Sequence, residues 1–203
     1  MNIRRLQGLA LIISALTGML FYILNFLPYI FNSIVILEVI YGVLFIVGLS
    51  AIQNIQPQTK KSWITRTRKW WIIGLIFMAI PPFHKIISGL TIIFAIDLES
   101  YIWVDLGFFM GIAYSGGYLL VGWLTTQTRV FPVWVGWLLI IAGILHTILW
   151  FSILYLQLLP LPIPITRILG GLSESGALAG YGWTIFNHQT AYSGQRAKAP
   201  RLH

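Results

Sequence analysis

The chain has 203 residues, of which 58% are hydrophobic and only 9% carry a charge, and its mean hydropathy is +0.83. Soluble domains are about one quarter charged, so this composition excludes a soluble globular protein and predicts an integral membrane protein. The chain contains no cysteine, which excludes disulfides, thiolate metal sites and iron–sulfur clusters.

Six apolar runs are long enough to cross a bilayer, because about 20 helical residues span its hydrocarbon layer. They lie near residues 6–27, 33–53, 70–96, 101–124, 131–157 and 165–187. The connections between them are short, so neighbouring spans must run antiparallel. We therefore expect an all-α fold, a six-transmembrane-helix bundle over residues 1–187, followed by a mobile basic tail over residues 188–203.

The basic residues predict the orientation of these spans. With six spans, 11 of the 13 basic residues and none of the five acidic residues fall on one side: Arg4, Arg5, Lys60, Lys61, Arg66, Arg68, Lys69, Arg129, Arg196, Lys198 and Arg201. By the positive-inside rule this side is cytoplasmic. Both termini are then cytoplasmic, in a multi-pass protein of a cell membrane of the bacterial inner type. The net charge of +8 therefore indicates topology, and we expect membrane lipid, not nucleic acid, to contact the basic side.

The third run contains Pro81 and Pro82, followed at once by His84 and Lys85. Prolines in a span leave backbone carbonyl groups without their helical donors. Ionisable side chains inside hydrocarbon are costly unless they have partners or a function. We therefore expect an interrupted helix beside a polar site.

The ionisable residues of the other spans fall at similar depths, toward the side opposite the termini. Counting about 1.5 Å of rise per residue, we expect one outward-opening polar cavity lined by Glu38, Lys85, Asp105, Arg167 and Glu174. Small residues on the fourth and sixth spans indicate that the helices around it pack closely.

Two histidines suggest a cofactor. His84 and His146 lie at nearly the same depth on separate spans, and two neutral imidazoles are what axial ligation of a haem requires, while one suffices for a chlorophyll magnesium. Our first hypothesis is thus a tetrapyrrole, haem or chlorophyll, bound by a subunit of a larger membrane complex in electron transfer or photosynthesis. The alternative for each histidine is a structural hydrogen bond to a neighbouring helix.

Two further functions remain open. The intramembrane acids and the lysine are typical of an ion-coupled small-solute carrier or a protein that binds a polar ligand. An intramembrane metal hydrolase could use the same carboxylates and imidazoles, but no metal-ligand spacing supports it. We favour a non-enzymatic role and assign no catalytic residue and no metal site. The apolar, proline-rich stretch 158–165 suggests contact with other membrane subunits or a second copy of the chain.

Overall fold

The computed structural model describes residues 3–24, 31–54, 62–94, 101–128, 131–151 and 162–197. Within these ranges it leaves out the side chains of 31–34, 53–54, 62–67, 101–110, 114, 128, 162–164 and 188–197. Every regular element in the described ranges is an α-helix. The six helices are α1 (Ile3–Leu24), α2 (Phe31–Asn54), α3 (Ser62–Ile93), α4 (Tyr101–Thr128), α5 (Val133–Phe151) and α6 (Pro162–Ala197).

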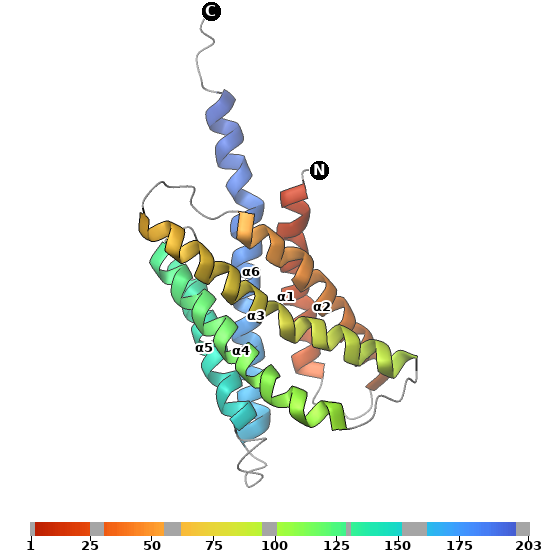
Figure 1. The fold of residues 1–203 in the computed structure, drawn as a ribbon. Coiled ribbons are helices and arrows are strands. Elements are labelled where there is room, and N and C mark those ends of the chain that lie inside the picture. Colours follow the sequence, from red (N-terminus) through yellow and green to blue (C-terminus); the bar gives the residue numbers. More distant parts are fainter. Residues whose placement is uncertain are drawn as a thin grey trace, which may run out of the picture.

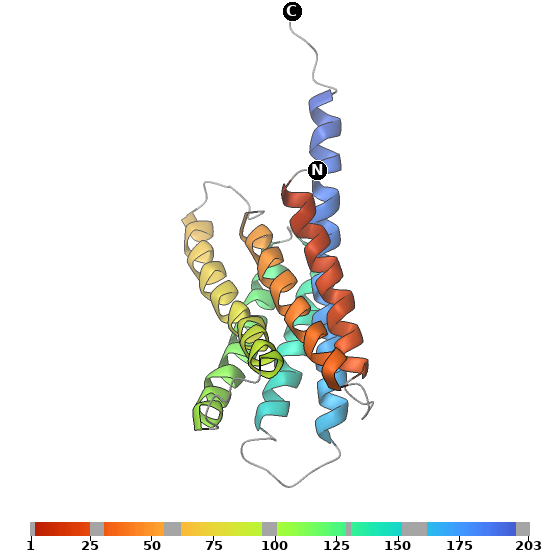
Figure 2. The same cartoon turned by 90° about the vertical axis from the view of Figure 1, so that its right-hand side faces the viewer.

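The helices form a closed circle. Each one packs against its neighbours in the chain, and α6 closes the circle by packing along α1. The start of α1 and the end of α6 lie at the same end of the bundle, and α6 extends past its neighbours there (Figures 1 and 2). A bundle of this kind places side chains from all six helices around one interior.

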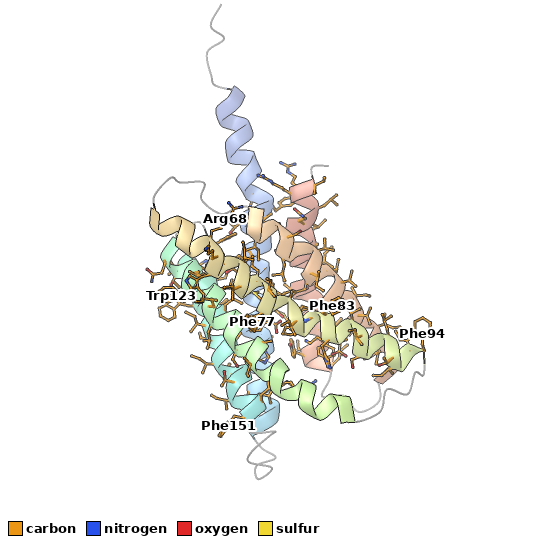
Figure 3. The ribbon with its side chains drawn as sticks, in the orientation of Figure 1. Arg68, Phe77, Phe83, Phe94, Trp123 and Phe151 are labelled. Carbon is orange, nitrogen blue, oxygen red and sulfur yellow. The ribbon has the colours of Figure 1, made fainter. Side chains whose placement is uncertain are left out.

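The outer surface of the bundle is apolar. Phe77 and Phe83 on α3, Trp123 on α4 and Phe151 at the end of α5 are all exposed and point away from the bundle (Figure 3). Four described segments are long and apolar enough to cross a membrane: Ile3–Leu24, Val35–Ile52, Arg68–Ile93 and Val133–Phe151. An apolar surface of this extent is typical of contact with lipid. The expected all-helical architecture, with several helices able to cross a membrane, is confirmed at this level.

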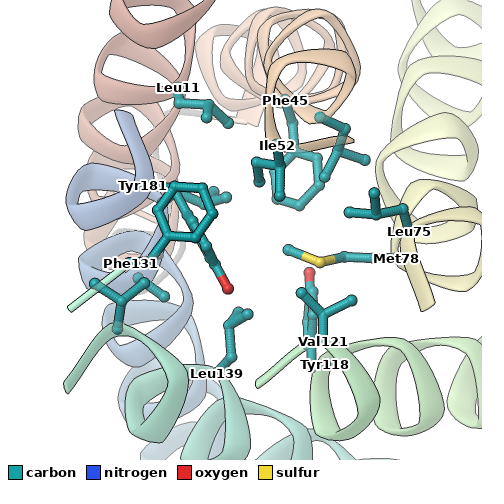
Figure 4. Packing of buried hydrophobic residues seen from close by; sticks show 14 of the residues in the cluster. Leu11, Phe45, Ile52, Leu75, Met78, Tyr118, Val121, Phe131, Leu139 and Tyr181 are labelled. Atoms are coloured by element: carbon teal, nitrogen blue, oxygen red, sulfur yellow. The ribbon is translucent and has the colours of Figure 1, made fainter. Parts of the chain in front are cut away.

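Buried apolar and aromatic side chains fill the half of the bundle near the termini. Phe45, Met78, Val121, Leu139 and Tyr181 meet there from five helices (Figure 4). The phenol of Tyr181 and the hydroxyl of Thr125 share a hydrogen bond inside this core. This half is therefore closely packed and nearly free of charge.

Glycines allow the helices to approach one another closely, as the small residues of the sequence predict. A Cβ atom on Gly182 of α6 would stand 2.6 Å from the carbonyl oxygen of Gly8 on α1, and one on Gly8 would stand 2.9 Å from that of Gly182. Gly122 of α4 and Gly136 of α5 face each other in the same way. No larger residue fits at either crossing without moving the backbones apart, so these pairs hold α1 against α6 and α4 against α5.

The expected interruption of the third span is wrong. Pro81 and Pro82 lie inside α3, which continues from Ser62 to Ile93. Each proline removes one N–H donor, but the residues after them resume the helix. The backbone of α3 is also supported at this point, because Gly42 of α2 lies against the carbonyl oxygen of Pro82.

The ends of the helices differ from the predicted spans at several places. α3 begins at Ser62, so the basic stretch before residue 70 is helical, and α5 ends at Phe151, with residues 152–157 outside the described ranges. α6 continues to Ala197 and covers ten residues of the expected tail; residues 198–203 are not described. The first turn of α6 also takes in the last residues of the stretch 158–165, of which 158–161 are not described.

Candidate functional site

The carboxylate of Glu174 is the centre of a polar cluster inside the bundle. Glu174 lies twelve residues into α6, and its side chain is only 1% exposed. A buried carboxylate is costly unless it is hydrogen-bonded and faces opposite charge. The surroundings of Glu174 satisfy both conditions.

Both oxygens of the carboxylate have two polar neighbours. Tyr41 and Tyr118 donate their phenol O–H groups to Oε1. Tyr22 donates to Oε2 at 2.9 Å, and Nε2 of His146 lies 3.4 Å from the same oxygen, within ion-pairing distance when the imidazole is protonated. Because an ionised carboxylate offers about four acceptor sites and a protonated one must donate, this arrangement fits the ionised form of Glu174.

Lys85 supplies the opposite charge. Its Nζ donates a hydrogen bond to the phenol oxygen of Tyr22 at 3.1 Å, so that Lys85, Tyr22 and Glu174 form a continuous hydrogen-bonded chain. Lys85 is 7% exposed and interacts electrostatically with Glu174 and with Glu38. Chains of this kind polarise each bond in turn and strengthen it in a medium of low dielectric constant.

The cluster takes one side chain from each helix. Its members are Tyr22 of α1, Tyr41 of α2, Lys85 of α3, Tyr118 of α4, His146 of α5 and Glu174 of α6. We call these six residues the Glu174 hub. All six are buried, so the hub connects every helix of the bundle at a single point.

Glycines near Glu174 make room for the large rings of the hub. A Cβ on Gly171, one turn before Glu174, would stand 2.2 Å from the ring of Tyr22. A Cβ on Gly18 of α1 would stand 2.7 Å from the ring of Tyr41. The small residues beside the hub therefore let phenol rings reach a carboxylate on a neighbouring helix.

The hub lies toward the end of the bundle opposite the termini. Tyr22 belongs to the last turn of α1, and His146 is five residues from the end of α5. On the other side of Glu174, Ala177 and Leu178 are fully buried and separate it from Tyr181, two turns or about 10 Å further along α6. The polar interior thus occupies one half of the bundle and the apolar core the other.

The structure brings together some of the residues expected in one polar cavity. Glu174 and Lys85 are in the hub. Glu38 is half-buried and interacts electrostatically with Lys85 and Arg167, while Arg167 itself is exposed. Asp105 lies in the part of α4 whose side chains are not described, so its place stays a prediction.

The phenols of the hub were not expected from the sequence. The predicted cavity was based on the depths of ionisable side chains only. Three of the four contacts to Glu174, however, come from Tyr22, Tyr41 and Tyr118. Tyrosines in the other spans could have been predicted as partners of Glu174. A carboxylate in a span needs donors from other spans, and tyrosine is a polar residue that such spans tolerate.

The tetrapyrrole hypothesis stays a prediction that the geometry does not favour. His146 turns Nε2 toward Glu174, and its ring lies 5.8 Å from the ring of Tyr118 at an angle of 43°. Axial ligation through Nε2 would therefore require His146 to leave the hub. His84 is half-buried on α3, beside Lys85 in the chain.

A metal centre finds no support in the described ranges, since no three histidine, aspartate or glutamate side chains there lie close enough together to hold an ion. Comparison with protein-family models, with curated proteins and with solved structures finds no match for this chain. The geometry of the hub is therefore the only basis for inferring a function.

Proposed function

We propose that the chain is a six-span membrane carrier in which Glu174 binds the proton that couples solute movement to a proton gradient. The observation that supports this is the convergence of polar side chains from four helices on a single buried carboxylate of α6, with Lys85 of α3 joined to it through Tyr22. Ionisable residues inside membrane proteins commonly mark proton relays and substrate paths.

The chemistry of Glu174 links proton binding to helix packing. In the ionised form it accepts from three phenols and attracts Lys85. Protonation removes the negative charge and turns one acceptor oxygen into a donor, so at least one phenol must turn away or break its bond. Each of the other five helices has a contact that depends on this one charge. A proton on Glu174 thus favours a looser bundle, which is the two-state behaviour that coupling requires.

The lengths and directions of the helices support six spans with cytoplasmic termini. α4 has 28 residues and α6 has 36, which at 1.5 Å per residue gives about 42 Å and about 54 Å. Either length exceeds the hydrocarbon thickness of about 30 Å. The described ends of α1 and α6 share one end of the bundle (Figure 1), and the basic excess of the sequence assigns that end to the cytoplasm.

The absence of cysteine makes this topology directly testable. Single cysteines in place of Gln58 and Ser100 would be treated in intact cells with a membrane-impermeant maleimide. We expect labelling at position 100 in intact cells and at position 58 only after the cells are opened. Labelling of both positions in intact cells would contradict six spans with this orientation.

Proton coupling is tested in proteoliposomes with the dye pyranine inside and an acidic exterior. Glucose, glutamate and n-propylammonium are added in turn as representatives of neutral, anionic and cationic solutes. We expect one class to increase proton entry with the natural protein and to have no such effect with Glu174→Gln. The matched control, Glu99→Gln, makes the same chemical change in the connection between α3 and α4 and should keep at least half of the coupled entry.

A folded but inactive variant must be distinguished from a misfolded one. Size-exclusion chromatography before reconstitution identifies misfolded protein. Tyr118→Phe provides a second test, because it keeps the carboxylate and removes only one donor; it should move the pH dependence of coupled entry. Solute uptake that depends on the proton gradient and is unchanged in both variants would refute the role of Glu174.

A further inference from the structure

The ammonium group of Lys85 lies in a cage of aromatic rings. Its Nζ is 5.0 Å from the ring centroid of Phe21, 4.9 Å from that of Tyr22 and 4.5 Å from that of Tyr41. All three rings are buried. A cation within about 6 Å of an aromatic face is attracted by the ring, and cages of several rings are how proteins recognise organic ammonium ligands.

The cage also carries polar groups that suit an amine. The phenol oxygen of Tyr22 accepts a hydrogen bond from Nζ at 3.1 Å, and the phenol of Tyr41 forms part of the wall while donating to Glu174. The negative charge of Glu174 lies behind these two phenols. The cage thus provides aromatic faces, an acceptor for N–H and a nearby counter-charge, which together favour a protonated amine over a neutral solute.

The walls and the occupant of the cage come from different helices. Phe21 and Tyr22 belong to α1 and Tyr41 to α2, whereas Lys85 is on α3. The cage would therefore keep its walls if the part of α3 that carries Lys85 moved. Lys85 would then still have a counter-charge, because the half-buried carboxylate of Glu38 interacts electrostatically with Lys85.

α3 has a weak point just before Lys85. Pro81 and Pro82 cannot donate hydrogen bonds to the carbonyl groups of Phe77 and Met78, four residues earlier in the helix. Two adjacent missing donors make this turn the easiest place for α3 to bend. The segment after the prolines, which includes Lys85, can thus move separately from the segment before them.

Two glycines lie against the backbone of α3 beside the prolines. Gly42 of α2 faces the carbonyl oxygen of Pro82, where a Cβ would stand at 2.6 Å. Gly117 of α4 faces the backbone nitrogen of Met78, also at 2.6 Å. At these two points no side chain of α2 or α4 interlocks with α3. Beyond the prolines the side chain of Ile86 lies against Gly42, so movement of the far part of α3 must break this contact.

We propose that the cage of Phe21, Tyr22 and Tyr41 is the binding site for a small primary ammonium solute, and that Lys85 occupies it in the closed state. The solute replaces Lys85 when the far part of α3 moves away. The exchange puts one ammonium group in the place of another, so the charge facing Glu174 is unchanged. This inference rests on the proposed carrier function and names the class of solute that the carrier would move.

The test is equilibrium binding of radiolabelled n-propylammonium to detergent-purified protein. Lys85→Ala removes the part of the side chain that n-propylammonium replaces. We expect Lys85→Ala to bind this amine about tenfold more tightly than the natural protein, because the amine no longer competes with a tethered ammonium. Lys69→Ala, which removes an exposed lysine of the same helix, should bind like the natural protein.

Three further measurements make the result decisive. Excess unlabelled n-propanol, a neutral compound of similar shape, should not displace the amine, and Glu174→Gln added to Lys85→Ala should abolish the gain. If Lys85→Ala does not fold, Lys85→Leu with methylammonium as the probe replaces it, with the same expected order of affinities. Equal affinity in the Lys85 and Lys69 variants, or displacement by n-propanol, would overturn the proposed site.

Binding is measured without any proton gradient, so it can fail independently of the proposed function. Tight amine binding by Lys85→Ala without coupled proton entry would keep the site and refute the carrier. Coupled proton entry with glucose or glutamate, together with no gain in amine binding, would keep the carrier and refute this site.

Discussion

The replacement Glu174→Gln should destabilise the protein strongly although it changes only one oxygen to an amide nitrogen. Glutamine keeps a single acceptor oxygen, so it can accept from about two of the four neighbours that Glu174 now has. If the amide nitrogen replaces Oε1, the hydrogen bonds from Tyr41 and Tyr118 are lost. If it replaces Oε2, the hydrogen bond from Tyr22 and the ion-pair contact of His146 are lost. A hydrogen bond to a charged group contributes about 1.5–3 kcal/mol to stability.

Two lost contacts of this kind amount to about 3–6 kcal/mol. The lower figure applies where the phenol of Tyr22 rotates and accepts from the new amide. Lys85 loses one of the two carboxylates with which it interacts electrostatically, the other being Glu38, and this loss adds to the destabilisation. We therefore expect the free energy of unfolding to fall by at least about 3 kcal/mol, a large part of the 5–15 kcal/mol typical of a folded protein.

The assay is reversible unfolding by sodium dodecyl sulfate in mixed micelles, followed by tryptophan fluorescence. Glu38→Gln is the matched control, because it makes the same chemical change at a half-buried carboxylate outside the hub; it should cost about 1 kcal/mol or less. Equal effects of the two variants, or a loss below 1 kcal/mol for Glu174→Gln, would refute the view that Glu174 organises the helices.

Two further predictions concern the partners of Glu174 and the space around it. Tyr118→Phe should lower the free energy of unfolding by about 1.5–3 kcal/mol. Its effect in the Glu174→Gln background should be at least about 1 kcal/mol smaller, since the two residues act through one contact. Additive effects of the two replacements would contradict that contact. Gly171→Ala puts a Cβ at 2.2 Å from the ring of Tyr22 and should cost about 1–3 kcal/mol in the same unfolding assay. Its control, Gly116→Ala, meets nothing within 4 Å and should be neutral or stabilising by up to about 1 kcal/mol; the reverse order would refute the packing at Gly171.

The sequence predicted the class of fold and part of the site for one physical reason. A charged side chain inside an apolar run must find a partner, so Lys85 and Glu174 were expected to share a polar site before any helix was placed. Their closeness in the structure, through Tyr22, follows from this requirement.

The remaining features depend on helix rotation, which composition and depth do not determine. Tyr41 and Tyr118 are full members of the hub, but a tyrosine in an apolar run fits equally well against lipid or against an apolar neighbour. His146 was expected to hold a cofactor, and its rotation turns it toward Glu174. Depth alone could not distinguish these two roles.

The effect of the two prolines on α3 could not be predicted from local chemistry alone. Pro81 and Pro82 each remove a backbone donor, which favours an interrupted span. The helix nevertheless continues to Ile93, because Gly42 and Gly117 let two neighbouring helices support its backbone. Local chemistry therefore predicts a weak point, and tertiary packing decides that the helix stays continuous.

The central claim, that the charge on Glu174 holds the bundle closed, can be tested by the reactivity of one introduced thiol. Ser175 is fully buried beside Glu174, and the natural chain has no cysteine, so Ser175→Cys reports access to the hub. Its rate of reaction with methyl methanethiosulfonate would be measured at neutral pH. Gln58→Cys, in the connection between α2 and α3, gives the reference rate, because the thiolate is the reacting form and needs contact with water.

We predict that Ser175→Cys reacts much more slowly than Gln58→Cys. Adding Glu174→Gln to Ser175→Cys should make its reaction fast, because the charge that holds the helices together is then gone. A rate of Ser175→Cys that is unaffected by Glu174→Gln would contradict the claim.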